Sequence, residues 1–439
     1  MTTIFTQDPA AATHPTVHHI PEPVTASSLG LDRGLLVDLS LKTLFYGGRM
    51  TRAELSGALK LSGSAMQDVL HAAKADDLVQ ILGSDGQGPA GYQYTLTQKG
   101  IDRAHDAFQR SGYVGPAPVS LSAYIHQTAQ QTVRGTTISR EQVQRALGNL
   151  VLSDETLGRI GRAAASRRST LIYGNSGNGK TSVVRALGAA SQSNILIPYA
   201  IEMVGQIVRL YDPSKHEIAH EERPSFDGSL FGHRRDERWI AIRRPVIWAG
   251  GELTRHSVEL QWDERTRLYE APLQLKANGG TLIIDDFGRQ RMPAVDLLNR
   301  WIGALEGNTD HLTLHTGQMV EIPFDVMVLF STNLMPTDLA DDAFLRRIRY
   351  KIELRNPTPA EFRTIFRNEC DRRGVRFDDM AVSHLVEHWY GARRDLRGCH
   401  PRDLVEAISD AAVFDGHAPA LTPGLLDEVC ATYFLHEPN

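Results

Sequence analysis

Cysteine is scarce in this sequence, with Cys370, Cys399 and Cys430 the only three among 439 residues. An odd number near one end of the chain excludes a disulfide-stapled scaffold and fits a reducing compartment. Long apolar runs are missing too. None approaches the roughly 18 residues of a membrane-spanning helix, and the first residues lack the charged, then apolar, pattern of a signal peptide. We therefore expect a cytoplasmic protein with no membrane span.

Positive charge is not in excess. The chain has 47 Lys and Arg against 52 Asp and Glu, a formal net charge of −5. This excludes a strongly basic nucleic-acid-binding protein as a description of the whole chain, although a local basic patch stays possible. With 41% hydrophobic residues, the chain has enough apolar side chains for a sizeable core. Its length suggests about three domains.

The first 120 residues divide into three segments that differ in composition and in hydrophobic period. Residues 1–30 show no period and predict a flexible tail. Residues 31–112 predict three helices, a hairpin around a Gly-rich turn and a last helix, an order that looks like a winged helix-turn-helix. The second helix follows Thr51, with Glu54 completing a capping box. Residues 113–120 are rich in Gly, Pro and Ser and predict a linker.

The charges of this N-terminal unit bear on its partner. Residues 31–112 contain nine Lys and Arg and nine Asp and Glu. The third helix, where DNA would dock, offers Lys74 and His71 against Asp68, Asp76 and Asp77. Phosphate neutralisation needs clustered cations, so protein docking is favoured. DNA binding remains the alternative.

The strongest motif follows the short apolar run at 171–173. The segment GNSGNGKT comes next and leads into the helix-forming SVVRALGAA, which is a P-loop between a strand and a helix. The glycines let backbone N–H groups converge on phosphates, and the helix N-terminus favours negative charge. Lys180 is expected at the β- and γ-phosphates and the Thr181 hydroxyl on Mg²⁺. The expected ATP-binding residues are Gly174, Asn175, Ser176, Gly177, Asn178, Gly179, Lys180 and Thr181.

A second apolar run, at 281–284, ends in two acids, Asp285 and Asp286. In an open parallel sheet such residues lie at the carboxyl edge of the strands, where ligands bind. We expect Asp285 to hold Mg²⁺ through water, and Asp286 to orient or deprotonate the attacking water.

Three further motifs follow in order. An apolar run at 326–330 ends in Ser-Thr-Asn333, a segment at 341–348 carries Arg346 and Arg347, and Cys399–Leu404 opens a helix containing Arg402. Over about 150–439 the ordered set resembles the AAA+ ATPase family. The resemblance implies that Asn333 contacts the γ-phosphate or the water. It also implies that Arg346 and Arg347 are arginine fingers reaching a neighbouring subunit's site, and that Arg402 couples a helical lid to the γ-phosphate.

The resemblance also implies an architecture. We expect an α/β fold in which a large ATPase domain over 121–355 contains a five-stranded parallel sheet, with strands near 170, 195, 281, 327 and 350. A helical lid should cover 356–439. Because arginine fingers complete a neighbour's site, the active form should be a homo-oligomeric ring, a hexamer.

The long interval between Lys180 and Asp285 predicts an insertion at about 205–275. It contains an alternating hairpin around Trp262, and a second hairpin is expected at 312–322. With SLFGH at 229–233, these features are similar to AAA+ proteins carrying a β-hairpin insert, such as MoxR-type chaperones, magnesium-chelatase subunits and enhancer-binding activators. The activators' GAFTGA loop has no match here. Phe231 and Trp262 are candidate pore-loop aromatics.

We therefore expect a Mg²⁺-dependent ATPase that couples hydrolysis to remodelling of a protein partner. A fainter likeness is to chaperone-like ATPases linked to pilus assembly. The alternative is an ATP-switched DNA-binding regulator or loader. A third reading, an ATP-gated scaffold with negligible turnover, stays open because Asp286 stands where the family usually has Glu.

Overall fold

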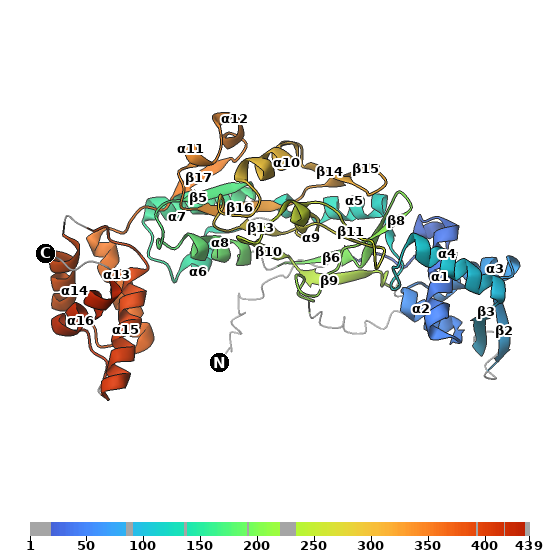
Figure 1. The fold of residues 1–439 in the computed structure, drawn as a ribbon, viewed down its shortest axis with the longest axis horizontal. Coiled ribbons are helices and arrows are strands. Elements are labelled where there is room, and N and C mark those ends of the chain that lie inside the picture. Colours follow the sequence, from blue (N-terminus) through green and yellow to red (C-terminus); the bar gives the residue numbers. More distant parts are fainter. Residues whose placement is uncertain are drawn as a thin grey trace, which may run out of the picture.

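The computed structural model describes residues 19–84, 91–135, 138–190, 193–219, 234–391, 394–416 and 418–434. Figure 1 shows a small N-terminal unit at one end, an α/β unit in the middle and a helical C-terminal unit at the other end. Contrary to the expectation of a flexible tail through residue 30, residues 19–30 pack on the protein. Ser62 Oγ donates to the Pro23 carbonyl at 2.7 Å, and the Ala26 N–H donates to Asp68 Oδ2 at 3.1 Å. Residues 1–18 lie outside the described part.

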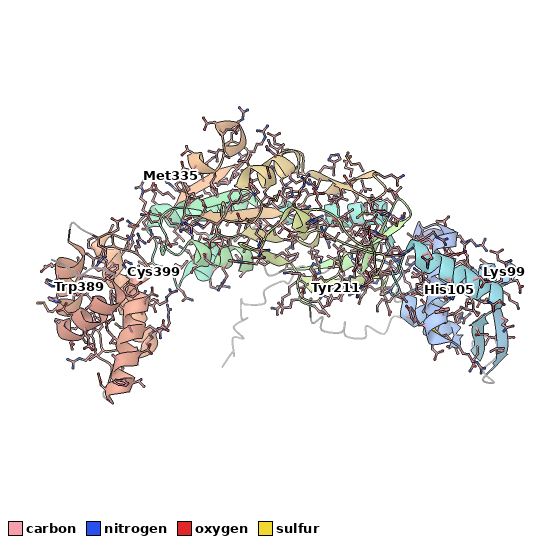
Figure 2. The ribbon with its side chains drawn as sticks, viewed as in Figure 1. Lys99, His105, Tyr211, Met335, Trp389 and Cys399 are labelled. Atoms are coloured by element: carbon pink, nitrogen blue, oxygen red, sulfur yellow. The ribbon has the colours of Figure 1, made fainter. Side chains whose placement is uncertain are left out.

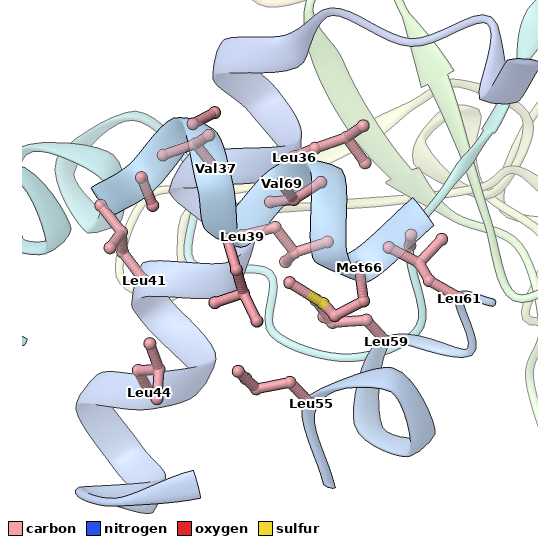
Figure 3. Packing of buried hydrophobic residues seen from close by; sticks show 14 of the residues in the cluster. Leu36, Val37, Leu39, Leu41, Leu44, Leu55, Leu59, Leu61, Met66 and Val69 are labelled. Carbon is pink, nitrogen blue, oxygen red and sulfur yellow. The ribbon is translucent and has the colours of Figure 1, made fainter. Parts of the chain in front are cut away.

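The N-terminal unit has the expected order of helices and strands. Its elements are α1 (Arg33–Gly47), β1 (Met50–Thr51), α2 (Arg52–Leu59), α3 (Gly63–Ala75), β2 (Val79–Ser84), β3 (Tyr92–Leu96) and α4 (Gln98–Arg110). Thr51 and Glu54 form the capping box expected at the start of α2. The strands form an antiparallel sheet in the order β1-β3-β2. Leucines of α1 and α2 pack against Met66 and Val69 of α3 in a buried core (Figure 3).

The segment expected to be a linker is packed between other elements. Lys42 of α1 donates from Nζ to the Tyr113 carbonyl at 2.7 Å, and the Ala117 N–H donates to the Leu59 carbonyl at 2.8 Å. The short strand β4 (Val119–Ser120) then pairs in parallel with β7 (Ala200–Met203). Helices follow as α5 (Leu121–Gln130), η3 (Val133–Gly135), α6 (Arg140–Leu147) and α7 (Asp154–Ser166).

A five-stranded parallel sheet forms the middle of the α/β unit. Its strands are β10 (Val246–Ala249), β13 (Thr281–Ile284), β16 (Met327–Thr332), β5 (Thr170–Tyr173) and β17 (Tyr350–Glu353), in that spatial order. Every neighbouring pair is parallel. Buried clusters that include α8 (Lys180–Ala189) and α10 (Ala294–Gly307) pack on the sheet. A parallel sheet covered in this way brings the carboxyl ends of all its strands to one edge.

The expectation that the strand near 195 belongs to this sheet is wrong. Residues Asn194–Pro198 form β6, which pairs antiparallel with β9 (Trp239–Arg243) in a separate two-stranded sheet. The fifth place is taken by β10, which lies inside the range expected to be an insertion. Both segments are short apolar runs, and such runs do not encode which sheet they join.

The two expected hairpins are present. Strands β11 (Gln261–Asp263) and β12 (Leu268–Glu270) pair antiparallel, and they extend a second sheet through β8 (Gln206–Arg209), β7 and β4. Strands β14 (Thr309–Thr313) and β15 (Met319–Pro323) form the other hairpin. Trp262 stacks on His315 with ring centroids 4.4 Å apart, which joins the two hairpins. The segment 229–233, with Phe231, lies outside the described residues.

The C-terminal unit is helical, as the sequence predicts. The α/β unit also contains the short helices η4 (Arg255–Val258), α9 (Leu273–Lys276), α11 (Pro336–Leu339) and α12 (Asp342–Leu345). The helices of the C-terminal unit are α13 (Pro359–Arg373), α14 (Asp379–Leu385), a π-helix (Val386–Tyr390), α15 (His400–Asp415) and α16 (Pro423–Tyr433). From α13 onward they enclose a core of their own that includes Phe362, Phe366 and Ile408. No helix in the described part of the chain combines the length and the apolar character that crossing a bilayer requires.

Candidate functional site

The loop after β5, Gly174 to Gly179, turns on glycines with positive φ. Gly174 has φ +137°, and a Cβ there would come within 2.3 Å of the Leu354 carbonyl oxygen. Gly179 has φ +80° and caps α8. These are conformations that glycine adopts without steric cost. The loop therefore turns tightly enough to present its N–H groups, and the N-terminus of the ten-residue α8, to one point.

Lys180 folds over this loop. Its side chain is buried, and Nζ donates to the Asn175 carbonyl at 2.9 Å. Burial lowers the pKa of Lys180, and the negative charges of Asp286 and Asp285 act in the opposite direction. The ammonium group thus lies against the loop, where the charges of both acids act on it. A bound phosphate chain would replace the Asn175 carbonyl as its partner.

Thr181 and Asp285 meet beside the loop. Thr181 Oγ1 donates to the Asp285 carboxylate at 3.1 Å and 3.2 Å, and Ser331 Oγ donates to the same carboxylate from the end of β16. A hydroxyl and a carboxylate fit Mg²⁺, which keeps several waters and shares phosphate oxygens instead of filling an all-protein cage. No group of three or more His, Cys, Asp or Glu residues suited to a metal occurs among the described residues.

Two more expected residues lie at this carboxyl edge. Asp286 follows β13, is exposed, and has a left-handed backbone with φ +50°. Asn333 follows β16, and its Oδ1 is buried with no hydrogen-bond partner in the structure. A buried amide oxygen without a partner costs free energy. This one therefore suits a ligand or a water at the site.

The loop is also held by residues that the sequence analysis does not identify. Asn356, just after β17, accepts from Asn178 Nδ2 at 2.8 Å and from Asn175 Nδ2 at 3.2 Å. The Gly398 N–H donates to Asn178 Oδ1 at 3.3 Å. Cys399 lies on the side of the C-terminal unit that faces the α/β unit (Figure 2), and a Cβ at position 177 would come within 2.4 Å of its Sγ. Single polar residues in a connector carry no motif, so no sequence signal marks them.

Arg402 does not contact the loop in this structure. Its guanidinium pairs with the neighbouring Asp403 at 2.8 Å, and its side chain is 58% exposed. Arg397 is the arginine of this unit whose positive charge helps lower the pKa of Lys180. Arg402, the arginine expected to reach the γ-phosphate, therefore lies on the first turn of α15, and Arg397 lies nearer the loop.

Arg346 and Arg347 lie away from the P-loop. Both line a pocket with Arg168 and Ser169, which come just before β5, whereas the P-loop comes just after it. Arg347 pairs with Glu306 of α10 at 2.7 Å. The two ends of a parallel strand lie at opposite edges of the sheet. The structure thus gathers the P-loop, Asp285, Asp286 and Asn333 at one edge and these two arginines at the other.

His400, at the start of α15, gives a testable pH dependence. Burial, with Arg397 and Arg394 nearby, lowers its pKa to about 4 from 6.5, and its Nδ1 is hydrogen-bonded to the Tyr390 hydroxyl at 2.8 Å. Because the folded-state pKa is the lower one, the unfolded chain binds the proton first. Stability from the neutral ring is therefore present above pH 6.5 and lost as pH falls towards 4.

We expect His400 alone to lower the unfolding free energy by about 2 kcal/mol between pH 7.5 and pH 5. Urea unfolding at both pH values checks this: the loss in His400→Gln should be smaller than in the wild type by that amount. His256→Gln, at an exposed position, is the control and should behave like the wild type. Equal losses in all three proteins would contradict the assignment.

Comparisons with known proteins give limited matches. A family model described as a domain of unknown function (DUF8689) matches residues 358–432. The search of curated proteins finds no match.

Among solved structures, NtrX from Brucella abortus in complex with ATP has a TM-score of 0.39 and 16% identity, over 70% of this chain and 61% of that chain. RuvB from Thermotoga maritima, a Holliday junction branch migration motor, has a TM-score of 0.35 and 13% identity, over 68% of this chain and 72% of that chain. The match spans about three-fifths of the NtrX chain, and the function proposed below rests on the residues of this chain.

Proposed function

We propose that this chain is a Mg²⁺-dependent ATPase of the AAA+ type. The observation that carries the proposal is the meeting of Thr181 Oγ1 with Asp285, 3.1 Å apart, beside the buried Lys180 at the mouth of a glycine loop. Two separate stretches of sequence, residues 174–181 and the end of β13, thus converge where a nucleotide's phosphates and their cation would bind. Mg²⁺, when bound, would neutralise charge on the β- and γ-phosphates.

Each residue of the proposed site has its own role in binding or hydrolysis. The loop from Gly174 to Gly179 supplies N–H groups to the phosphates, and Lys180 supplies a positive charge. Thr181 and Asp285 hold the cation. Asp286 accepts a proton from the attacking water or orients it, and the unpartnered Oδ1 of Asn333 accepts a hydrogen bond from the same water.

We also propose that the chain acts as a homo-oligomeric ring, a hexamer. Arg346 and Arg347 lie at the sheet edge opposite the P-loop, so they act on a nucleotide bound to the adjacent copy. Arg402 couples the C-terminal helical unit, as a lid, to the γ-phosphate. Planar guanidinium groups suit phosphate better than lysine does.

The partner that this ATPase remodels is proposed to be a protein, recruited by a winged-helix-like N-terminal unit. In helix-turn-helix proteins the N-terminal residues of the recognition helix contact base edges. Here the start of α3 is covered: Ser62 and Ser64 donate to the carbonyls of Pro23 and Val24 at 2.7 Å and 2.5 Å. The segment 23–26 thus occupies the end of the helix that DNA would need.

The test of the proposed function is Asp286→Asn, with Asp338→Asn as a control at another exposed aspartate. We expect the wild type to release phosphate from ATP only with Mg²⁺. Asp286→Asn should bind ATP but hydrolyse it about 100-fold more slowly, because a positioned base contributes about 10²–10⁴-fold. A wild type without Mg²⁺-dependent phosphate release would contradict the ATPase assignment.

The same variant identifies the partner. Asp286→Asn should remain in its ATP state, so tagged protein recovered from lysate with ATP should retain a client that it loses with ADP. A protein retained only with ATP supports remodelling. Recovery of DNA without protein would instead favour the DNA-binding alternative.

A further inference from the structure

A cationic pocket lies at the sheet edge opposite the P-loop. It encloses about 250 Å³, and ten of the described residues line it. Five of them are arginines that come from three stretches of chain: Arg134 from η3, Arg168 from the approach to β5, and Arg346, Arg347 and Arg349 from the approach to β17. The only carboxylate among the ten is Glu306. Since arginine stays protonated in proteins, five positive charges face one negative charge.

The pocket lacks the acids that would balance it. Glu306 is already paired with Arg347. Arg134, Arg168, Arg346 and Arg349 form no salt bridge with any described residue. Asp325, whose negative charge raises the pKa of Arg134 against the effect of burial, accepts hydrogen bonds from Thr132 Oγ1 and the Val133 N–H, each at 2.7 Å. In addition, Arg134 Nε is buried without a hydrogen-bond partner.

The ligand that best suits this pocket is an anion with several oxygen atoms. Like charges gathered in one pocket repel one another unless an opposite charge joins them, and guanidinium groups bind phosphate oxygens with paired N–H donors. A phosphate chain meets both conditions. It offers more negative charge than a single carboxylate, and its several oxygens can accept hydrogen bonds from arginines that come from three stretches of chain.

The chain's own P-loop cannot deliver that phosphate chain. Arg168 precedes β5 and Gly174 follows it, and at about 3.3 Å per residue the two backbones are roughly 20 Å apart. A second copy can deliver it, because a site at one edge and its complement at the opposite edge meet in a head-to-tail interface. The nucleotide then lies between two copies.

We propose that Arg134 and Arg168 bind the phosphate chain of a nucleotide held by the P-loop of a second copy of this chain, alongside Arg346 and Arg347. This inference rests on the proposed function. It adds two phosphate-binding residues from parts of the sequence that carry no motif. It also accounts for five arginines around one carboxylate in this pocket.

The test compares Arg134→Ala/Arg168→Ala with the wild type. The P-loop is untouched in this variant, so ATP affinity, measured with a fluorescent ATP analogue, should stay within twofold. Phosphate release should fall at least about tenfold, since each arginine is a charge-assisted contact to phosphate. Arg159→Ala, an exposed arginine of α7 paired with Glu155, is the control. Arg168→Lys, which keeps the charge but loses the paired donors, should be intermediate.

A mixing experiment shows whether the pocket acts between copies. Lys180→Ala keeps the arginine pocket but loses the P-loop lysine, and the double variant has the reverse defect. Mixed in equal amounts, they should release phosphate faster than either does alone. Failure of the mixture to recover, with the double variant folded by circular dichroism and inactive alone, would overturn the proposal. So would full activity of the double variant.

The same experiment separates this inference from the proposed function. If the wild type does not release phosphate, the ATPase assignment fails, and the pocket is then tested by assembly. Size-exclusion chromatography with a non-hydrolysable ATP analogue and Mg²⁺ should shift the wild type, but not the double variant, to a larger species. An equal shift of both, or of neither, would overturn the proposal. Binding of the analogue to Lys180→Ala with wild-type affinity would show that the pocket takes free nucleotide instead, which would also overturn it.

Discussion

Replacing Lys180 with alanine is expected to abolish phosphate release and to weaken ATP binding by a factor of about 30 to several thousand. The reason is the position of Nζ, which is buried at the mouth of the loop, 2.9 Å from the Asn175 carbonyl. Losing one member of a desolvated, hydrogen-bonded charge pair costs about 2–5 kcal/mol, and about 1.4 kcal/mol is tenfold in affinity. Titration with a fluorescent ATP analogue measures the change.

The control for this variant is Lys215→Ala, at an exposed lysine of the α/β unit. It should leave both ATP affinity and phosphate release at the wild-type level. Thermal unfolding of both variants checks that the fold survives. An unchanged ATP affinity in Lys180→Ala would refute the role of the P-loop.

Replacing Arg347 with alanine is expected to slow phosphate release about a thousandfold while leaving ATP affinity unchanged. Arginine fingers contribute about 10³–10⁵-fold in P-loop enzymes. Arg347 lies at the sheet edge away from its own P-loop, so its removal should spare nucleotide binding in the same copy. This split between binding and hydrolysis distinguishes it from Lys180→Ala.

Loss of the ion pair with Glu306 is a second effect of the same substitution. Glu306→Gln breaks that pair and keeps the guanidinium, so it should retain hydrolysis near the wild-type rate. If Glu306→Gln and Arg347→Ala lose activity equally, the arginine acts by holding the local structure. Wild-type turnover in Arg347→Ala would refute the finger assignment altogether.

The sequence predicts local structure and motif positions well in this chain. The capping residue Thr51 marks a helix start, and the spacing of the glycines marks the P-loop. These signals depend on interactions over a few residues. Sheet membership depends on distant pairing instead, which is why the strand at Asn194–Pro198 is placed in the wrong sheet and β10 takes its position.

The residues of the site show the same contrast between local sequence signals and contacts between distant parts of the chain. Asp285 is recognisable because it ends an apolar strand, and the structure brings it to Thr181. Asn356 and Gly398 are hydrogen-bonded to Asn178 of the P-loop, yet neither belongs to a pattern of residue types at fixed spacing. Arg134 and Arg168 are equally unmarked, because their proximity to Arg346 arises only when the strands align.

The position of β5 between β16 and β17 has a consequence for the synthesis of the chain. β16 begins 157 residues after β5 (327 minus 170), so at about 5–20 residues per second β5 leaves the ribosome about 8 to 30 s before its first partner in the sheet. Gly398 and Cys399, which pack on the loop, follow later still. We therefore expect a nascent chain to be unable to retain ATP until almost all of it has been made.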